Sequence, residues 1–325
     1  MHLIKGTGFA KMTITPQASE PLEKVVRPTT FIESRRLSRH LGIDLVLASE
    51  TFQHTGSFKF RAAYNLASTV PHHEIITASS GNFGQALAYS CSLLGKQCTI
   101  VMPATSAQVK IDAVRDFGGI VDLTDVRVKG RNERLAEVAR EKPLAFAASP
   151  YDDPLVIQGN ASLGREICQS GRDFDFIVAP VGGGGLSSGI IKGVRQSGKD
   201  ARIKIVGAEP LIANDAARSL REGRLIKNDF EPMTIADGAR TPSLGQHNWQ
   251  ILREGISDIV EVPEDKIKEA VRLLFAAANL KAEPTGALGL AAVMTKPEIF
   301  RGHSVCCVIS GGNVDPAVYS ELLAG

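Results

Sequence analysis

The chain has little of what marks secreted, zinc-binding or membrane proteins. Its five cysteines are odd in number and show no C-x-x-C spacing, so neither a disulfide framework nor a zinc site is expected. No apolar run approaches the ~20 residues of a membrane helix, and the N-terminal stretch lacks an apolar segment of signal-peptide length. We therefore expect a reducing, cytoplasmic location and no membrane partner. Residues before Met12 are left out of the fold prediction.

An excess of charge of one sign is also missing. The chain carries 37 basic and 35 acidic residues, mixed along its length, for a formal net charge of +2. No extended basic surface is expected, which argues against a nucleic-acid partner and favours a small-molecule substrate. A content of 43% hydrophobic and 22% charged residues is typical of soluble globular proteins. Over 325 residues, one large or two unequal domains are expected.

What the chain does have is a regular alternation of strand and helix patterns. Short apolar runs rich in β-branched residues predict strands over 44–49, 74–79, 97–102, 176–181, 203–208, 258–262 and 304–310. Amphipathic patterns predict helices over 82–95, 106–117, 129–141, 154–170, 184–198 and 263–281. Such alternation predicts an α/β chain whose mainly parallel sheets are covered by helices on both faces.

Two polar breaks suggest how the chain is divided into domains. One lies at residues 71–73 and the other at Ser149 and Pro150. We predict a small domain of residues 71–149, inserted into a large, discontinuous domain made of residues 1–70 and 150–325.

Four consecutive glycines follow one of the predicted strands. Gly182, Gly183, Gly184 and Gly185, with Leu186, lie between the strand FIVAPV and a helical pattern from Ser187. Glycines leave backbone N–H groups unobstructed beside a helix start, which is a suitable cradle for a phosphate. A flexible turn is the simpler interpretation, but a linker is seldom preceded by a buried strand and followed by a helix.

Two nucleotide-binding signatures can be tested against this glycine run. A P-loop requires a lysine after its last glycine, and the run has none. A dinucleotide fingerprint fits better, because Gly182 and Gly184 match its first two glycines and Glu209 ends a later strand. Ser187 occupies the third glycine position, however. A nicotinamide-dependent oxidoreductase therefore stays open as an alternative of another class.

A second turn of small polar residues follows the predicted strand EIITAS. It contains Ser79, Ser80, Gly81, Asn82 and Phe83. Such residues at a helix start are ordinarily caps, yet this turn has more of them than capping requires. Its N–H groups are candidates for holding a substrate carboxylate, and the Asn82 side chain for bonding a phenolic oxygen.

A lysine stands at a third predicted helix start. Residues 55–57 predict the start, which places Lys59 in the first helical turn. The positive end of the helix dipole and burial between Phe58 and Phe60 both favour the neutral amine over the ammonium ion. A neutral lysine amine is what Schiff-base chemistry needs, although most lysines are solvated surface charges.

Taken together, these motifs resemble one enzyme family. The order TGSFKFR, SSGNFGQA, GGGGL, GAEP, IADG, AEPTGA and SGGN resembles the threonine dehydratase and serine racemase branch of the fold-type II pyridoxal-phosphate enzymes, from about Arg27 to Asp315. The resemblance implies a tryptophan synthase β-like fold with two open parallel-sheet domains and the cofactor between them. Homodimers are common in the family, so a homodimer is expected.

The resemblance also assigns roles to residues. It implies that Lys59 holds pyridoxal 5'-phosphate as a Schiff base with Phe58 beside it, and that Asn82 bonds the phenolic oxygen of the cofactor. The segment from Gly182 to Leu186 would hold the phosphate, and Ser310 would face the pyridine nitrogen. Residues 79–83 would bind the amino-acid substrate.

The activity implied is β-elimination, in which threonine, serine or a related hydroxylated amino acid gives a 2-keto acid and ammonia. Ser80 stands where racemase-like members carry serine, so it is expected to exchange a proton on the face opposite Lys59, and amino-acid racemisation is the alternative. Phe83 replaces a common histidine, which leaves the substrate open. Arg131 and Tyr151 are further candidates for the substrate side, beside surface or packing roles.

A cation site is the last feature that the resemblance implies. Glu209, Ala213 and Asp215 match the spacing of a divalent-cation site in racemase-like members. Two carboxylates and a backbone carbonyl are hard oxygen ligands suited to Mg²⁺ or Ca²⁺. Without the resemblance, the simpler interpretation is that one acid lies at the end of a strand and the other on the surface of a helix.

Overall fold

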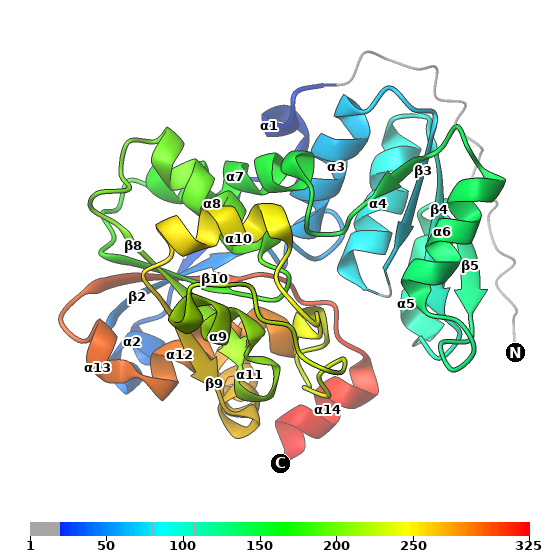
Figure 1. Cartoon of the computed structure of the whole chain (residues 1–325). Helices are drawn as coiled ribbons and strands as arrows, with labels where there is room; N and C mark the ends of the chain where they lie inside the picture. The colour runs from blue at the N-terminus through cyan, green and yellow to red at the C-terminus, as the bar shows by residue number, and fades with distance from the viewer. Residues whose placement is uncertain (1–19, 80, 107) are drawn as a thin grey trace, which may run out of the picture.

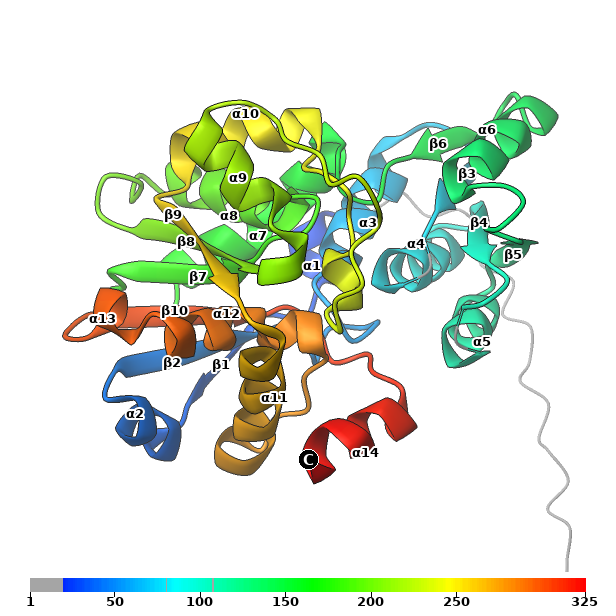
Figure 2. The same ribbon diagram turned by 60° about the horizontal axis from the view of Figure 1, so that its bottom comes forward.

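The larger of two sheets forms the centre of the fold. The computed structural model describes residues 20–79, 81–106 and 108–325. The strand order is β1-β2-β10-β7-β8-β9, and only β1 runs antiparallel to its neighbour (Figure 1 and, with all six strands labelled, Figure 2). The strands are β1 (Thr30–Glu33), β2 (Asp44–Ser49), β10 (Ser304–Ile309), β7 (Phe176–Pro180), β8 (Lys204–Pro210) and β9 (Asp258–Val262).

Helices cover both faces of this sheet (Figure 2). One layer contains α7 (Pro154–Cys168), α8 (Gly185–Gln196), α9 (Asp215–Glu222) and α10 (Gln246–Gly255). The other contains α2 (Arg35–Leu41), α11 (Glu264–Ala278), α12 (Pro284–Thr295), α13 (Pro297–Phe300) and α14 (Pro316–Ala324). Because both faces are covered, central strands such as β7 are apolar at every position rather than alternating.

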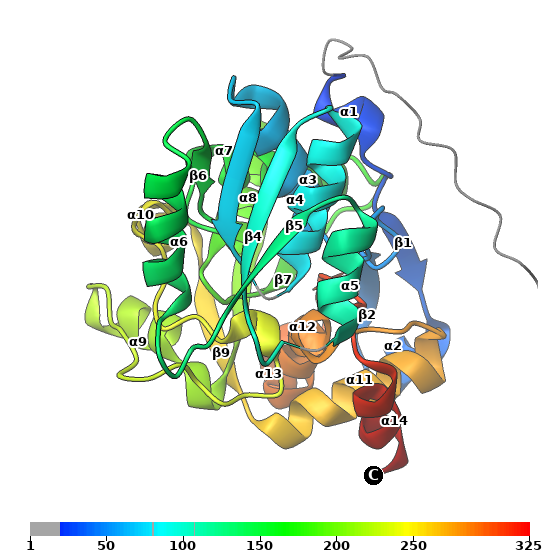
Figure 3. The same ribbon diagram turned by 90° about the vertical axis from the view of Figure 1, so that its right-hand side faces the viewer.

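The smaller sheet is parallel throughout and has the order β5-β4-β3-β6 (Figure 3). Its strands are β3 (Glu74–Ala78), β4 (Gln97–Pro103), β5 (Ile120–Thr124) and β6 (Phe146–Ala148). The helices around it are α3 (Lys59–Thr69), α4 (Asn82–Leu93), α5 (Gln108–Asp116) and α6 (Arg131–Glu141), and the short α1 (Leu22–Val25) packs on α3. The α/β class with parallel sheets is thus confirmed. All four strands lie within residues 71–149, while the division into domains stays a prediction.

A buried arginine fixes the start of α3. Arg61 is fully buried and bonds Glu50 Oε2 over 2.7 Å and Glu166 Oε1 over 2.6 Å. A further hydrogen bond of 3.0 Å joins its guanidinium to Thr29 Oγ1. Paired and fully bonded charges of this kind are costly to separate, so α3 is held firmly against the end of β2 and against α7.

Candidate active site

Lys59 opens α3, as predicted, and its amine is removed from solvent. Nζ donates a hydrogen bond of 2.7 Å to the backbone oxygen of Pro150. Burial lowers the pKa of Lys59 from 10.5 to about 8, against an opposing effect of the nearby Glu283 carboxyl. The amine is therefore far easier to deprotonate than a surface lysine.

The aromatic surroundings of the amine differ in part from the sequence prediction. Lys59 Nζ lies 5.1 Å from the centre of the Phe58 ring and 5.7 Å from that of Phe83. Phe60 instead packs against His54 and other rings of the smaller core. The prediction that Phe60 flanks the amine is wrong, because side chains two positions apart in a helix point about 200° apart, so Phe58 and Phe60 face opposite sides.

The glycine run joins β7 to α8. Gly184 has a φ of +92°, in the left-handed region, and α8 begins at Gly185. The ring of Tyr151 lies where a Cβ of Gly183 would be, so a side chain there would displace it. Tyr151 follows Pro150 in the chain. The segment of these two residues therefore contacts both the Lys59 amine and the glycine run.

These residues fit a phosphorylated cofactor. Among the described residues, none provides a hydrogen-bond partner for the N–H groups from Gly182 to Gly185. Thr241 Oγ1 lies 3.6 Å from the Cβ position of Gly182 and is buried, also without a partner in the described chain. Unpaired donors at a helix N-terminus suit a phosphate, and the donor set is what the predicted phosphate site requires.

The turn before α4 is organised by Ser79. Its Oγ accepts hydrogen bonds from the N–H groups of Gly84, over 3.1 Å, and Gly81, over 3.4 Å, so it serves as a cap. The N–H groups of Asn82 and Phe83 find no partner among the described residues and are open to a carboxylate. Ser80 lies outside the described residues.

Ser310 directly follows β10 and is buried. Its backbone oxygen accepts a hydrogen bond of 3.0 Å from the N–H of Phe58. Ser310 thus lies next to the segment that carries Lys59. Its role toward a ring nitrogen stays a prediction.

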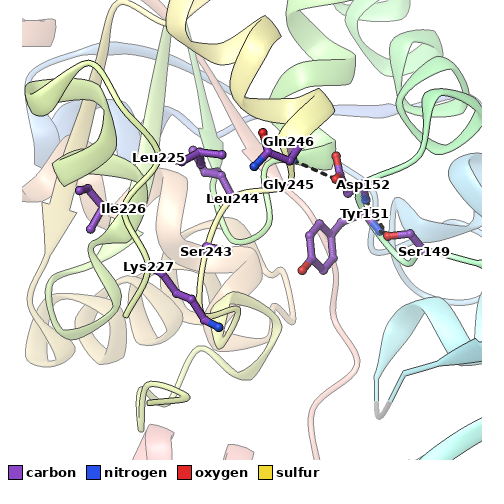
Figure 4. Close-up of a pocket in the computed structure, with 10 residues that line it drawn as sticks. All are labelled: Ser149, Tyr151, Asp152, Leu225, Ile226, Lys227, Ser243, Leu244, Gly245 and Gln246. Atoms are coloured by element: carbon purple, nitrogen blue, oxygen red, sulfur yellow. Dashed lines mark hydrogen bonds between the residues drawn. The ribbon is translucent and has the colours of Figure 1, made fainter. Parts of the chain in front are cut away.

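A cavity of about 560 Å³ opens beside Tyr151 (Figure 4). Asp152 accepts hydrogen bonds of 2.9 Å each from the N–H groups of Gln246 and His247, which ties the Tyr151 segment to the start of α10. The lining residues are Ser149, Tyr151, Asp152, Leu225, Ile226, Lys227, Ser243, Leu244, Gly245 and Gln246. Arg131 does not line this cavity, and it forms an ion pair of 3.0 Å with Glu231.

The predicted cation ligands follow one another from the end of β8 to the start of α9, and the carboxyls of Glu209 and Asp215 interact there. Ala213 ends a short 3₁₀ helix, η1 (Leu211–Ala213), and Asp215 begins α9. Glu209 accepts hydrogen bonds from the N–H groups of Ala216, over 3.1 Å, and Ala217, over 3.0 Å. Asp215 Oδ2 is buried with no partner in the described chain.

Burial raises the pKa of both acids, that of Asp215 to about 7. Two buried carboxylates favour a bound cation or a shared proton. No group of three or more His, Cys, Asp or Glu side chains suited to a metal occurs in the described part of the chain.

Three residues at the site were not predicted from the sequence: Glu283, Asn313 and Thr241. Glu283 Oε1 accepts a hydrogen bond of 2.7 Å from Asn82 Nδ2, and Asn313 Nδ2 donates one of 2.8 Å to Asn82 Oδ1. The motifs AEPTGA and SGGN contain Glu283 and Asn313, so the signal was present. What the sequence did not supply was the contact with Asn82, more than two hundred positions away.

Comparisons with known proteins agree with this geometry. The chain is 34% identical to an L-threo-3-hydroxyaspartate ammonia-lyase of a Pseudomonas species, over 95% of this chain and 97% of that protein. It is 36% identical to the serine racemase of Homo sapiens, over 88% of this chain and 86% of that protein. The solved structure of the T.th. threonine deaminase superposes with a TM-score of 0.85 at 37% identity, covering 90% of this chain and 95% of that one.

The resemblance seen in the motifs is thus confirmed along most of the chain. The model of the family described as "Pyridoxal-phosphate dependent enzyme" matches residues 22–311. With a buried lysine amine, a glycine run of open N–H groups and this match together, the chain belongs to the pyridoxal-phosphate-dependent enzymes, with the fold of threonine deaminase and serine racemase.

Proposed function

We propose that this enzyme eliminates water from a β-hydroxy amino acid, such as threonine, serine or a related hydroxylated substrate, and yields a 2-keto acid and ammonia. The observation that carries the proposal is the Lys59 amine, whose pKa is lowered to about 8 and which bonds Pro150 O, one residue before the tyrosine that lies against the glycine run. An amine that loses its proton near neutral pH can both attach to an aldehyde and accept a proton.

Bound pyridoxal phosphate supplies an electron sink that stabilises negative charge at the α-carbon of the substrate. The protein supplies orientation. The N–H groups from Gly182 to Gly185 and the Thr241 hydroxyl would hold the phosphate, and those of Asn82 and Phe83 the substrate carboxylate. Lys59 Nζ would accept the α-proton, after which the β-hydroxyl leaves as water and the released enamine hydrolyses to the keto acid and ammonia.

The relatives support this reaction class. Proteins similar along most of the chain are named as ammonia-lyases of L-threo-3-hydroxyaspartate and L-threonine. The nicotinamide-dependent alternative gains nothing from these matches, and the glycine run also lacks the third fingerprint glycine, because Ser187 stands there with its hydroxyl bonded to Pro180 O.

Racemisation is the second candidate. Serine racemases of several organisms match the chain, and the sequence has serine at position 80, on which the opposite-face proton exchange would depend. A single enzyme can catalyse both reactions, because both begin with loss of the α-proton.

A divalent cation, Mg²⁺ or Ca²⁺, is proposed at Glu209, the Ala213 backbone oxygen and Asp215, in a structural or activating role. Its support is the buried, unpaired Asp215 oxygen beside a second carboxylate. The homodimer and the cytoplasmic location stay predictions. In the described residues no helix is long and apolar enough to cross a membrane.

A substrate panel tests the proposed function. Serine, threonine, 3-hydroxyaspartate and larger β-hydroxy amino acids are each assayed for keto acid and for the inverted enantiomer. We expect keto acid from at least one substrate, abolished in Lys59→Ala and retained in the matched variant Lys268→Ala, whose lysine is exposed on α11. Neither product from any substrate, or full activity of Lys59→Ala, would contradict the proposal.

A further inference from the structure

The amide of Asn82 is enclosed by two polar side chains from the other part of the fold. Asn82 opens α4, beside the smaller sheet, whereas Glu283 precedes α12 and Asn313 follows β10, beside the larger sheet. The Asn82–Glu283 and Asn82–Asn313 hydrogen bonds measure 2.7 and 2.8 Å. Both ends of the Asn82 amide are therefore bonded, one to each partner.

A backbone carbonyl fixes the polarity of this arrangement, that is, which end of each amide donates and which accepts. Asn313 Nδ2 donates a hydrogen bond of 2.7 Å to Thr55 O, and a backbone oxygen can only accept. The NH₂ group of Asn313 must therefore face this way, and its second N–H donates to Asn82 Oδ1. With Oδ1 thus occupied, the NH₂ group of Asn82 faces Glu283, and the usual ambiguity of amide orientation is removed.

Two glycines make room for the partners. Gly56 has a φ of +70°, and Asn313 Oδ1 occupies the place where a Cβ would stand. At Gly311, a Cβ would lie 2.5 Å from Glu283 Oε1. Glu283 itself is only 3% exposed, so its carboxyl has few positions open to it. Close packing by glycines thus fixes both side chains where they meet Asn82.

We propose that Asn313 and Glu283 are positioning residues that hold the amide of Asn82 with its NH₂ group toward the place of the phenolic oxygen of the cofactor. The inference rests on the proposed function, in which Asn82 bonds that oxygen. One N–H of Asn82 is used by Glu283, and the second is left to donate to the cofactor. Without the polarity set from Thr55, the amide could present its oxygen instead, which would repel an ionised phenolic group.

Charges around Glu283 affect its protonation but not the orientation of the Asn82 amide. Burial and the Asp237 carboxylate raise the pKa of Glu283 to about 8, against Lys110, the Asn82 hydrogen bond and Lys281. Lys59 faces it from α3. Either protonation state of a carboxyl retains an oxygen that can accept from Asn82.

The first test removes the acceptor without a difference in charge. Glu283→Gln and Glu283→Met are both neutral and similar in size, but glutamine keeps an oxygen that can accept from Asn82, whereas methionine has only a weakly accepting sulfur. We expect the cofactor dissociation constant of Glu283→Gln to stay within about threefold of wild type, and that of Glu283→Met to rise about tenfold. The absorption maximum of the bound cofactor should shift in Glu283→Met alone. Equal behaviour of the two variants overturns the proposal.

The second test asks whether Asn313 acts through Asn82. Asn313→Asp keeps the shape but removes both donors, and we expect a rise of about tenfold in the dissociation constant. In an Asn82→Ala background, the same change should have no further effect, because its target is gone. Additive losses in this cycle overturn the proposal. Thermal midpoints of the apoproteins, with Glu264→Gln as a control for a partly buried acceptor on α11, separate loss of stability from loss of orientation.

The outcomes also separate this inference from the proposed function. If wild-type protein binds no cofactor at Lys59, the proposed function fails and the inference falls with it. If the wild type binds it and the variant pairs do not differ, the inference alone fails.

Discussion

Lys59 and Pro150 are joined by a hydrogen bond of 2.7 Å from the amine to the backbone oxygen, which ties the start of α3 to the segment that carries Tyr151. The Tyr151 ring in turn lies against Gly183 of the glycine run. One short segment thus connects the two features on which the proposed cofactor binding depends, and each can be changed separately.

The lowered pKa of Lys59 predicts how cofactor capture depends on pH. An aldehyde reacts with the neutral amine, and the pKa of about 8 means that the neutral fraction rises through pH 8 instead of pH 10.5. We expect the rate at which apoprotein captures pyridoxal phosphate to rise with pH, with a midpoint near 8. Stopped-flow absorbance measures this rate. A midpoint near the ordinary lysine pKa would contradict the burial of the amine.

Two glycines share a positive φ, so a comparison of their alanine variants distinguishes a loss of phosphate binding from backbone strain alone. Gly184 and Gly198 both have positive φ, but a Cβ on Gly184 would lie 2.9 Å from Asn248 Cβ, whereas one on Gly198 meets nothing within 4 Å. We expect alanine to cost about 1–2 kcal/mol of unfolding free energy at Gly198, where only the backbone is strained, and more at Gly184, where the Cβ also meets Asn248. Only Gly184→Ala should also weaken cofactor binding, by about tenfold or more, because the N–H groups beside it are displaced.

Urea unfolding of the apoproteins and cofactor titration measure the two effects. Equal cofactor affinity of the two alanine variants would argue against a phosphate at the glycine run.

Ser80→Ala tests the proposed racemisation. If the Ser80 hydroxyl exchanges a proton on the face opposite Lys59, its removal should lower racemisation by at least about 100-fold and leave much of the elimination. Chiral chromatography and keto-acid assays on the same samples measure both. Ser92→Ala, a serine of α4 away from the site, is the control. Equal loss of both activities would count against a base specific to one face.

The proposed cation site predicts a change in stability. Saturating Mg²⁺ or Ca²⁺ should raise the thermal midpoint of chelator-treated protein by roughly 5 °C, since a ligand that binds only the folded state stabilises it. Asp215→Asn should abolish the rise, because it weakens the unpaired oxygen ligand. An unchanged midpoint in the wild-type protein on addition of either ion would exclude the site.

The sequence predicted those features that are local in the chain. Lys59 in a first helical turn and the strand–glycine–helix order at residues 176–196 each depend on residues within about one element, and the structure has both. The missed strands β1, β5 and β6 have only three to five residues each and are partly exposed, so their apolar patterns are weak. Helix α12 is buried on all sides and lacks the amphipathic period.

Contacts between distant segments could not be predicted from the sequence. The Asn82–Glu283 pair and the Phe83 ring beside Lys59 depend on how α3, α4 and α12 pack, which no local pattern encodes. For the same reason Phe60 was assigned to the amine and lies instead in the core of the smaller sheet. The motifs marked which residues matter, while their partners emerged only in the folded chain.

The most direct measurement is borohydride reduction of the protein loaded with pyridoxal phosphate, followed by peptide mass analysis. We expect the peptide containing Lys59 to gain the mass of the reduced cofactor, the yellow colour to be lost, and Lys59→Ala to gain no such mass. Cofactor attached to a different lysine, or a protein that stays unmodified after loading and reduction, would contradict it.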